Sequence, residues 1–236
     1  NPSTLTTYAV AFLTSVSLFG LVDAGRVNDA ALVASAITQA FAAHGHALVE
    51  HAVPAPQCQA LAAMASQDEV ASHTLSGGTR NMLAQPWCAA LAQQLRAHPN
   101  ISACLPADAQ AVQCTYFEKT ADRNWLVAPH QDLSVPVAQQ VAAPGWQGWA
   151  AKEGHWFVQP PAAWLAHMVA ARLHLDDRGP SDGPLRVLPG THTHGHLSPA
   201  AMATLRQQGT EAVCTAPAGA ALLMRPLLVH ASSKST

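Results

Sequence analysis

Two histidines and one carboxylate in this chain have the side-chain types of a metal site. His130 and Asp132 lie two residues apart in the segment APHQD, and His230 lies far downstream in LVHAS. Two imidazoles and one carboxylate on one side of a metal ion form a facial triad, which leaves open coordination positions and suits Fe(II) in oxygen chemistry. The spacing by itself is not specific, because the chain holds 13 histidines and repeats the pattern at His174 and Asp176.

The elements that must position these residues are helices followed by many short strands. Helical periodicity, caps and an initial proline predict helices at residues 28–44, 57–72, 85–97 and 198–208. Strands are predicted at residues 46–53, 111–118, 135–141, 157–159, 169–175, 185–188, 211–215, 221–224 and 227–230. Residues 144–154, rich in Gly and Trp, are predicted to be irregular. The fold class is therefore mainly β with flanking helices (α+β), and we expect a barrel or jelly roll.

The composition is that of one packed domain. Hydrophobic residues make up 49% and charged residues 11%, which favours a large core over disorder. A net charge of -2 excludes the basic footprint of a nucleic-acid-binding protein. Five widely spaced cysteines without a CxxC pair argue against a disulfide framework and a structural zinc site, and predict a cytoplasmic location.

The N-terminal part, residues 1–27, is an apolar segment that allows two interpretations. Residues 5–22 contain no charged side chain, and this length is close to the minimum for a membrane span. Five hydroxyl residues lie within it and no Lys or Arg precedes it, so we favour a packed helix or an appended segment over a membrane or export signal. Residues 28–236 are predicted to form a single domain with a helical part, 28–105, and a jelly-roll core, 106–236.

The barrel prediction helps to choose between the two His-x-Asp pairs. In a double-stranded barrel the first two ligands lie near an early strand and the last histidine on a late one. Between Asp132 and His230 there is room for about six strands, but between Asp176 and His230 for only about three. The count favours His130 and Asp132.

Three motifs together resemble the phytanoyl-CoA dioxygenase family of Fe(II)/2-oxoglutarate-dependent oxygenases. They are His130-Gln131-Asp132, the run GPLRVLPGTH at 183–192 and VHASS at 229–233, and the likeness covers about residue 31 to the end. The resemblance implies a double-stranded β-helix core, with iron bound by His130, Asp132 and His230. It also implies a dioxygenase with Fe(II), 2-oxoglutarate and O2, which hydroxylates a small molecule and releases succinate and CO2.

The same resemblance implies where 2-oxoglutarate binds. Its far carboxylate needs a cation, preferably an arginine whose fork matches it. The family's arginine lies beyond the position of Thr236. Either the final strand that carries it is lacking, or another cation substitutes; Arg172 is the first candidate for that role, unless it is a surface or strand-pairing residue. Ser232 matches a hydroxyl beside that carboxylate. The lesser pocket candidates are Gln113, Thr115 and Gln131.

Other polar and aromatic residues have two interpretations each. Arg80 could reach the substrate or lie in a solvated loop, and Trp125 could line the pocket or belong to the core. The histidines of THTHGH, residues 191–196, fit an exposed loop better than a second metal site.

Two further hypotheses remain beside the dioxygenase. One is a noncatalytic or truncated jelly-roll protein that binds a metal or a small ligand, and the other is a cupin-type metal enzyme without a cosubstrate. In each case the expected partner is a small molecule and not nucleic acid or a membrane.

Overall fold

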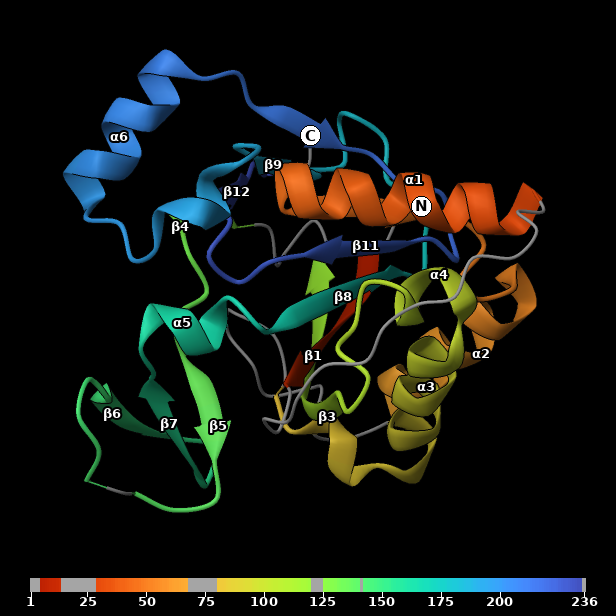
Figure 1. The fold of residues 1–236 in the computed structure, drawn as a ribbon. Helices are drawn as coiled ribbons and strands as arrows, with labels where there is room; N and C mark the ends of the chain where they lie inside the picture. The colour runs from red at the N-terminus through yellow and green to blue at the C-terminus, as the bar shows by residue number, and fades with distance from the viewer. Residues whose placement is uncertain (1–4, 14–28, 68–79, 120–124, 141, 235–236) are drawn as a thin grey trace.

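The computed structural model describes residues 5–13, 29–67, 80–119, 125–140 and 142–234, and these contain three antiparallel β-sheets (Figure 1). The largest sheet has five strands in the order β2 (His46–Val49), β11 (Ala221–Met224), β8 (Val169–His174), β1 (Leu5–Leu13) and β3 (Gln110–Lys119). The second sheet has four strands in the order β10 (Ala212–Cys214), β9 (Leu185–Val187), β12 (His230–Ser232) and β4 (Val127–His130).

The two larger sheets share a core, and β11 shows how they are packed. Successive side chains of a strand point to opposite faces, and all four residues of β11 are nevertheless buried. Leu222 and Met224 join a cluster with Leu185 of β9 and Cys214 of β10, whereas Leu223 joins the cluster beneath the helices. Both faces of the large sheet are therefore covered. This arrangement is the double-stranded β-helix core, and the predicted fold class is confirmed.

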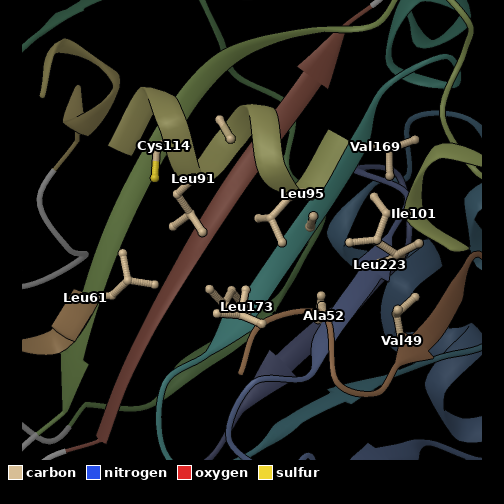
Figure 2. Close-up of a cluster of buried hydrophobic side chains, with 14 of the residues drawn as sticks. Val49, Ala52, Leu61, Leu91, Leu95, Ile101, Cys114, Val169, Leu173 and Leu223 are labelled. Carbon is tan, nitrogen blue, oxygen red and sulfur yellow. The ribbon is translucent and has the colours of Figure 1, made fainter. Parts of the chain in front are cut away.

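Four helices cover the outer face of the large sheet. They are α1 (Asp29–His44), α2 (Ala55–Gln67), α3 (Pro86–Ala97) and α4 (Pro99–Ser102). In α3 the buried residues recur at helical spacing, which places Leu91 and Leu95 against the sheet near Cys114 and Leu173 (Figure 2). Pro86 occupies the first turn, where its missing N–H costs no helical hydrogen bond.

A small three-stranded sheet forms a lobe beside the two larger sheets (Figure 1). Its order is β5 (Val135–Val137), β7 (His155–Gln159) and β6 (Gln147–Lys152), and α5 (Ala162–Leu165) follows it. Val135 and Val158 pack with Leu165 in a separate cluster. The remaining elements are η2 (Met82–Ala84), η3 (Thr191–His194) and α6 (Pro199–Gln208).

Several predicted elements agree with the structure. The helices α1, α3 and α6 lie within two residues of their expected bounds, and the Ser198 hydroxyl caps α6 by accepting a hydrogen bond from the Ala201 N–H at 3.2 Å.

All five cysteines are buried, and none of them forms a disulfide. Among the described helices, none is both long and apolar enough to cross a bilayer. The division into domains at residues 28 and 106 stays a prediction.

Three predictions of secondary structure were wrong. Residues 5–13 form the inner strand β1 and not a helix, because an uncharged run rich in β-branched and aromatic residues fits a strand in the middle of a sheet. The rest of the expected helix, residues 14–22, lies outside the described residues. Residues 147–152 form β6 within the stretch expected to be irregular. The last strand begins at His230, where it was expected to end.

His174, the histidine of the competing His-x-Asp pair, lies in the core. It is 2% exposed, and neither ring nitrogen has a hydrogen-bond partner among the described residues. Burial lowers its pKa to about 3, and the positive charges of Arg172 and Arg178 act in the same direction. His174 is therefore neutral in the folded protein, as expected of a core histidine.

His174 should make the protein less stable as the pH falls below about 6.5. Its pKa is 6.5 in an unperturbed chain and about 3 in the fold, so between these values only the unfolded chain takes up the proton. From about pH 7.5 to about pH 5, this residue should lower the free energy of unfolding by about 2 kcal/mol. Urea unfolding at both pH values should show that His174→Leu loses about 2 kcal/mol less than the wild type. The matched control His155→Leu, at an exposed position, should leave the pH dependence of unfolding unaltered. Equal losses of unfolding free energy in His174→Leu and in the wild type would contradict the prediction.

Candidate metal centre

The pairing of β4 with β12 brings the three predicted ligands together. His130 ends β4, His230 begins β12, and the antiparallel register places these two residues opposite each other. Asp132 follows β4, where its backbone N–H donates to the Pro226 carbonyl at 2.8 Å. One ligand atom from each of the three side chains lies within 4.8 Å of the other two, and among the described residues no other such group of His, Cys, Asp or Glu occurs.

The tautomers of both histidines suit metal binding. His130 Nδ1 lies 2.9 Å from the Ala128 carbonyl, and His230 Nδ1 lies 2.9 Å from the Leu228 carbonyl. A carbonyl only accepts, so each Nδ1 carries the hydrogen and each Nε2 keeps a lone pair. Both Nε2 atoms lie 3.6 Å from a different oxygen of Asp132. Two imidazole nitrogens and one carboxylate oxygen therefore converge on one point, as in a facial triad.

The charges of the site keep Asp132 ionised. Removal from water works to raise its pKa, but the interactions with the His230 and His130 side chains and the positive charge of Arg172 outweigh this and lower the pKa. Burial lowers the pKa of His230, which is 6% exposed. For His130 burial acts in the same direction, but the negative charge of Asp132, 3.6 Å away, raises the pKa on balance. The site thus offers an anionic oxygen beside two imidazoles.

Gln131, between two of the ligands, fastens the motif to the surrounding chain. Its Nε2 donates to the carbonyls of Gly195 at 2.9 Å and Leu227 at 2.7 Å, and its Oε1 accepts from the Leu197 N–H at 2.9 Å. The amide is buried and held by three backbone groups. Its polar contacts therefore indicate a structural role, which differs from the predicted contact with the cosubstrate.

The turn at residues 189–192, PGTH, holds the backbone that precedes His230. The Thr191 hydroxyl donates to the Leu188 carbonyl at 2.7 Å and accepts from the Val229 N–H at 3.0 Å. Gly190 precedes it with φ of 84°, a left-handed conformation that glycine adopts without steric cost. These bonds fix the backbone immediately before His230.

Two cavities meet at the metal ligands. The smaller has a volume of about 130 Å³, and its lining includes His130, Asp132, His230, Ser232, Arg172 and Arg178. The larger has a volume of about 420 Å³ and shares His130 and Asp132 with the smaller one. A metal bound by the triad would therefore face both spaces.

The predicted site residues all line one of these cavities. Arg172 and Ser232 line the smaller one, and their contact with the far carboxylate of 2-oxoglutarate stays a prediction. Gln113, Thr115, Gln131 and Arg80 line the larger one, and Trp125 lines both. Gln113 Nε2 donates to the Thr115 hydroxyl at 2.9 Å, so these two side chains form one polar patch on β3.

Arg178 is the residue that sequence reasoning missed. It is 5% exposed, lines the smaller cavity, and donates from Nη1 to the Asp182 carbonyl at 2.9 Å. Backbone hydrogen bonds with Ala216 hold its main chain in place. It lies in the run DDRGPSDG, which was interpreted only as an acidic turn. An arginine in a polar turn is usually solvated, so no local signal marks its burial.

Both arginines bring positive charge to the smaller cavity. Burial, aided by the charge of Arg178, lowers the pKa of Arg172 to about 10, so it remains protonated at neutral pH. Burial also lowers the pKa of Arg178. Neither guanidinium forms an ion pair with a carboxylate of the described residues. The smaller cavity is therefore suited to an anion.

A double-stranded β-helix with such a triad is typical of non-haem metal oxygenases. The family described as phytanoyl-CoA dioxygenase (PhyH) matches residues 22–236. The chain thus belongs to the phytanoyl-CoA dioxygenase family of Fe(II)/2-oxoglutarate-dependent oxygenases and is an oxidoreductase. No curated protein sequence matches it.

Solved structures share this fold at low sequence identity. The non-haem α-ketoglutarate-dependent carbocyclase SnoK from nogalamycin biosynthesis has 13% identity and a TM-score of 0.58 over 90% of this chain and 82% of its own. HygX from Streptomyces hygroscopicus, with nickel and 2-oxoglutarate bound, has 15% identity and a TM-score of 0.53 over 85% and 80%. The epimerase SnoN has 13% identity and a TM-score of 0.50 over 87% and 77%. The likeness concerns the architecture.

Removal of one ligand should abolish tight metal binding. His230→Ala deletes one of the three donors, and we expect its affinity for Fe(II) to fall by about 100-fold or more, since even residues that only orient metal ligands are worth 10–100-fold. Anaerobic equilibrium dialysis with elemental analysis measures the bound metal. His194→Ala, at an exposed position of η3, is the matched control and should bind as the wild type does. Equal metal content in His230→Ala and wild type would rule out this centre.

Proposed function

We propose that this chain is a non-haem Fe(II)/2-oxoglutarate-dependent dioxygenase that hydroxylates a small molecule and releases succinate and CO2. The observation that carries the proposal is one cavity lined by the triad and by two arginines, the half-buried Arg172 and the buried Arg178. His130, Asp132 and His230 would hold the iron. When bound, iron and 2-oxoglutarate supply the oxidative activation of O2, and the protein supplies binding, orientation and exclusion of water.

The arginines explain how the chain would bind a dianion at the metal. 2-Oxoglutarate has a carboxylate at each end, so one end needs the metal and the other a cation. A guanidinium fork matches a carboxylate bidentately, and Arg172 and Arg178 face the same cavity as the triad. A bound carboxylate would also offset the repulsion between the two guanidinium groups. Ser232, two residues after His230, adds a hydroxyl to the same lining.

The apolar part of the smaller cavity strengthens this binding. Val127, Leu185 and Met224 lie in its lining and would help to exclude water from the charged groups when a cosubstrate is bound. Charge interactions are stronger where water is excluded, because the effective dielectric constant is lower. Cosubstrate binding would therefore depend strongly on the arginines.

The larger cavity is the proposed site of the substrate. Its volume of about 420 Å³ lies in the range typical of small-molecule sites. Because it shares His130 and Asp132 with the smaller cavity, substrate and cosubstrate would approach the same metal from two spaces. The noncatalytic alternative rested on the missing C-terminal arginine of the family, and Arg172 and Arg178 in the lining support the dioxygenase instead.

Loss of the Arg172 charge should weaken 2-oxoglutarate binding without removing the metal. Breaking a buried charge pair costs about 2 kcal/mol or more, so we expect the Kd of 2-oxoglutarate to rise by about 30-fold or more in Arg172→Gln, and less in Arg172→Lys. The visible metal-to-ligand charge-transfer band of anaerobic Fe(II) protein measures this binding. Arg96→Gln, at an exposed position of α3, should match the wild type.

Two outcomes would count against these assignments. An unchanged Kd in Arg172→Gln would contradict the arginine site. Wild-type protein that binds iron but gives no charge-transfer band with 2-oxoglutarate would contradict the proposed function.

A further inference from the structure

The larger cavity is lined by an unusual set of charged side chains. Its lining contains two cationic side chains, Arg80 and Lys152, in addition to His130, Gln131 and Asp132 of the metal motif. Asp132 is the one carboxylate among the described lining residues, and the metal would occupy it. The net charge available to a ligand in this cavity therefore depends on whether Arg80 and Lys152 are each paired with a carboxylate.

Arg80 is neutralised by a neighbouring glutamate. Its Nη1 lies 3.0 Å from Glu153 Oε1, and its backbone N–H donates to Glu153 Oε2 at 3.1 Å. Asn81 Nδ2 donates to the Glu153 carbonyl at 3.3 Å. Glu153 lies in the turn between β6 and β7, so these bonds fasten the tip of that hairpin to residues 80–81. Arg80 thus helps to position the hairpin.

Lys152 is left as the cation without a carboxylate partner among the described residues. It ends β6 and pairs in register with His155 of β7. Its Nζ lies 5.1 Å from the centroid of the Phe157 ring, and Phe157 is 2% exposed. A cation on an aromatic face is stabilised by about 0.5–1 kcal/mol at an exposed site, which leaves its hydrogen-bond donors available. An anion in the cavity would bind these donors more strongly.

The rest of the cavity wall is largely apolar and aromatic. Phe117, Trp125, Phe157 and Met168 all line it. Aromatic side chains bind apolar or aromatic groups of a ligand through large contact areas. An amine in this space would meet the charge of Lys152, and desolvating like charges side by side is unfavourable.

From these contacts we infer that the larger cavity selects a small molecule with an anionic group and an apolar or aromatic body, and that Lys152 binds the anion. The inference rests on the proposed function, because it makes this molecule the substrate beside the metal. Lys152 is then a residue that determines specificity, and Glu153 holds its hairpin in place through Arg80.

The test compares three ligands with one carbon skeleton. Anaerobic protein saturated with Fe(II) and 2-oxoglutarate is titrated calorimetrically with 4-phenylbutyrate, 4-phenylbutyramide and 4-phenylbutylamine. Saturating 2-oxoglutarate keeps the carboxylate probe away from Arg172. A charge-assisted hydrogen bond is worth about 1.5 kcal/mol or more, so the carboxylate should bind about tenfold more tightly than the amide, and the amine most weakly.

Variants assign the preference to Lys152. Lys152→Met should abolish the preference for the carboxylate over the amide, whereas Lys152→Arg should keep it. Lys234→Met is the matched control, since Lys234 is exposed and lines neither cavity, and it should keep the full preference. The band with 2-oxoglutarate should persist in all four proteins.

The outcomes separate this inference from the proposed function. Equal affinity for carboxylate and amide, including no measurable binding of either, would overturn the inference while the charge-transfer band upholds the function. A preference that survives in Lys152→Met would also overturn it. A preference that depends on Lys152 in protein without the band would support the anion site and count against the proposed function.

Discussion

The antiparallel pairing of β4 with β12 is the contact on which the site depends. It sets His130 opposite His230, although these residues are far apart in the sequence. Each histidine bonds through Nδ1 to the carbonyl two residues before it, at 2.9 Å in both cases. The same local geometry therefore occurs twice, and the two Nε2 atoms face one carboxylate. A change of register by one residue would turn one imidazole to the other face of the sheet.

The surrounding structure holds this pairing in place through backbone contacts. Gln131 binds the backbone of residues 195, 197 and 227, and Thr191 binds the backbone before His230. These side chains use their polar groups on the main chain. Metal sites need such support, because ligand orientation contributes to affinity. Arg225 has a similar role further away: it lies over Phe41 of α1 and donates to the carbonyls of Ala166 and Met168.

The charges around the triad divide the site into two parts. Arg172 and Arg178 face the smaller cavity, Lys152 and Arg80 face the larger one, and Asp132 lies between them. The charge of Arg172 helps to keep Asp132 ionised, and the cations of each cavity favour anions in the space that they line. A five-carbon dianion and a larger anionic substrate could then occupy neighbouring sites, each with its own cation.

Local sequence patterns predicted much of the fold and part of the site. Caps and helical spacing identified α1, α3 and α6, and alternation with β-branched residues identified β3 and β8. The pattern failed for β1, because an uncharged run fits a buried strand as well as a helix, and only pairing with β3 and β8 decides between them. It also failed for β6, where Gly and Trp residues concealed a strand.

The sequence by itself determined which residue types could bind a metal, and the order of its motifs was enough to choose His130, Asp132 and His230. Only the tertiary structure showed that Arg178 and Lys152 also face the space around that centre. Arg178 reaches the smaller cavity because its turn is bonded to Ala216, and Lys152 reaches the larger one because β6 pairs with β7. Both placements arise from the packing of separate chain segments, and the short-range periodicity of a sequence carries no information about such contacts.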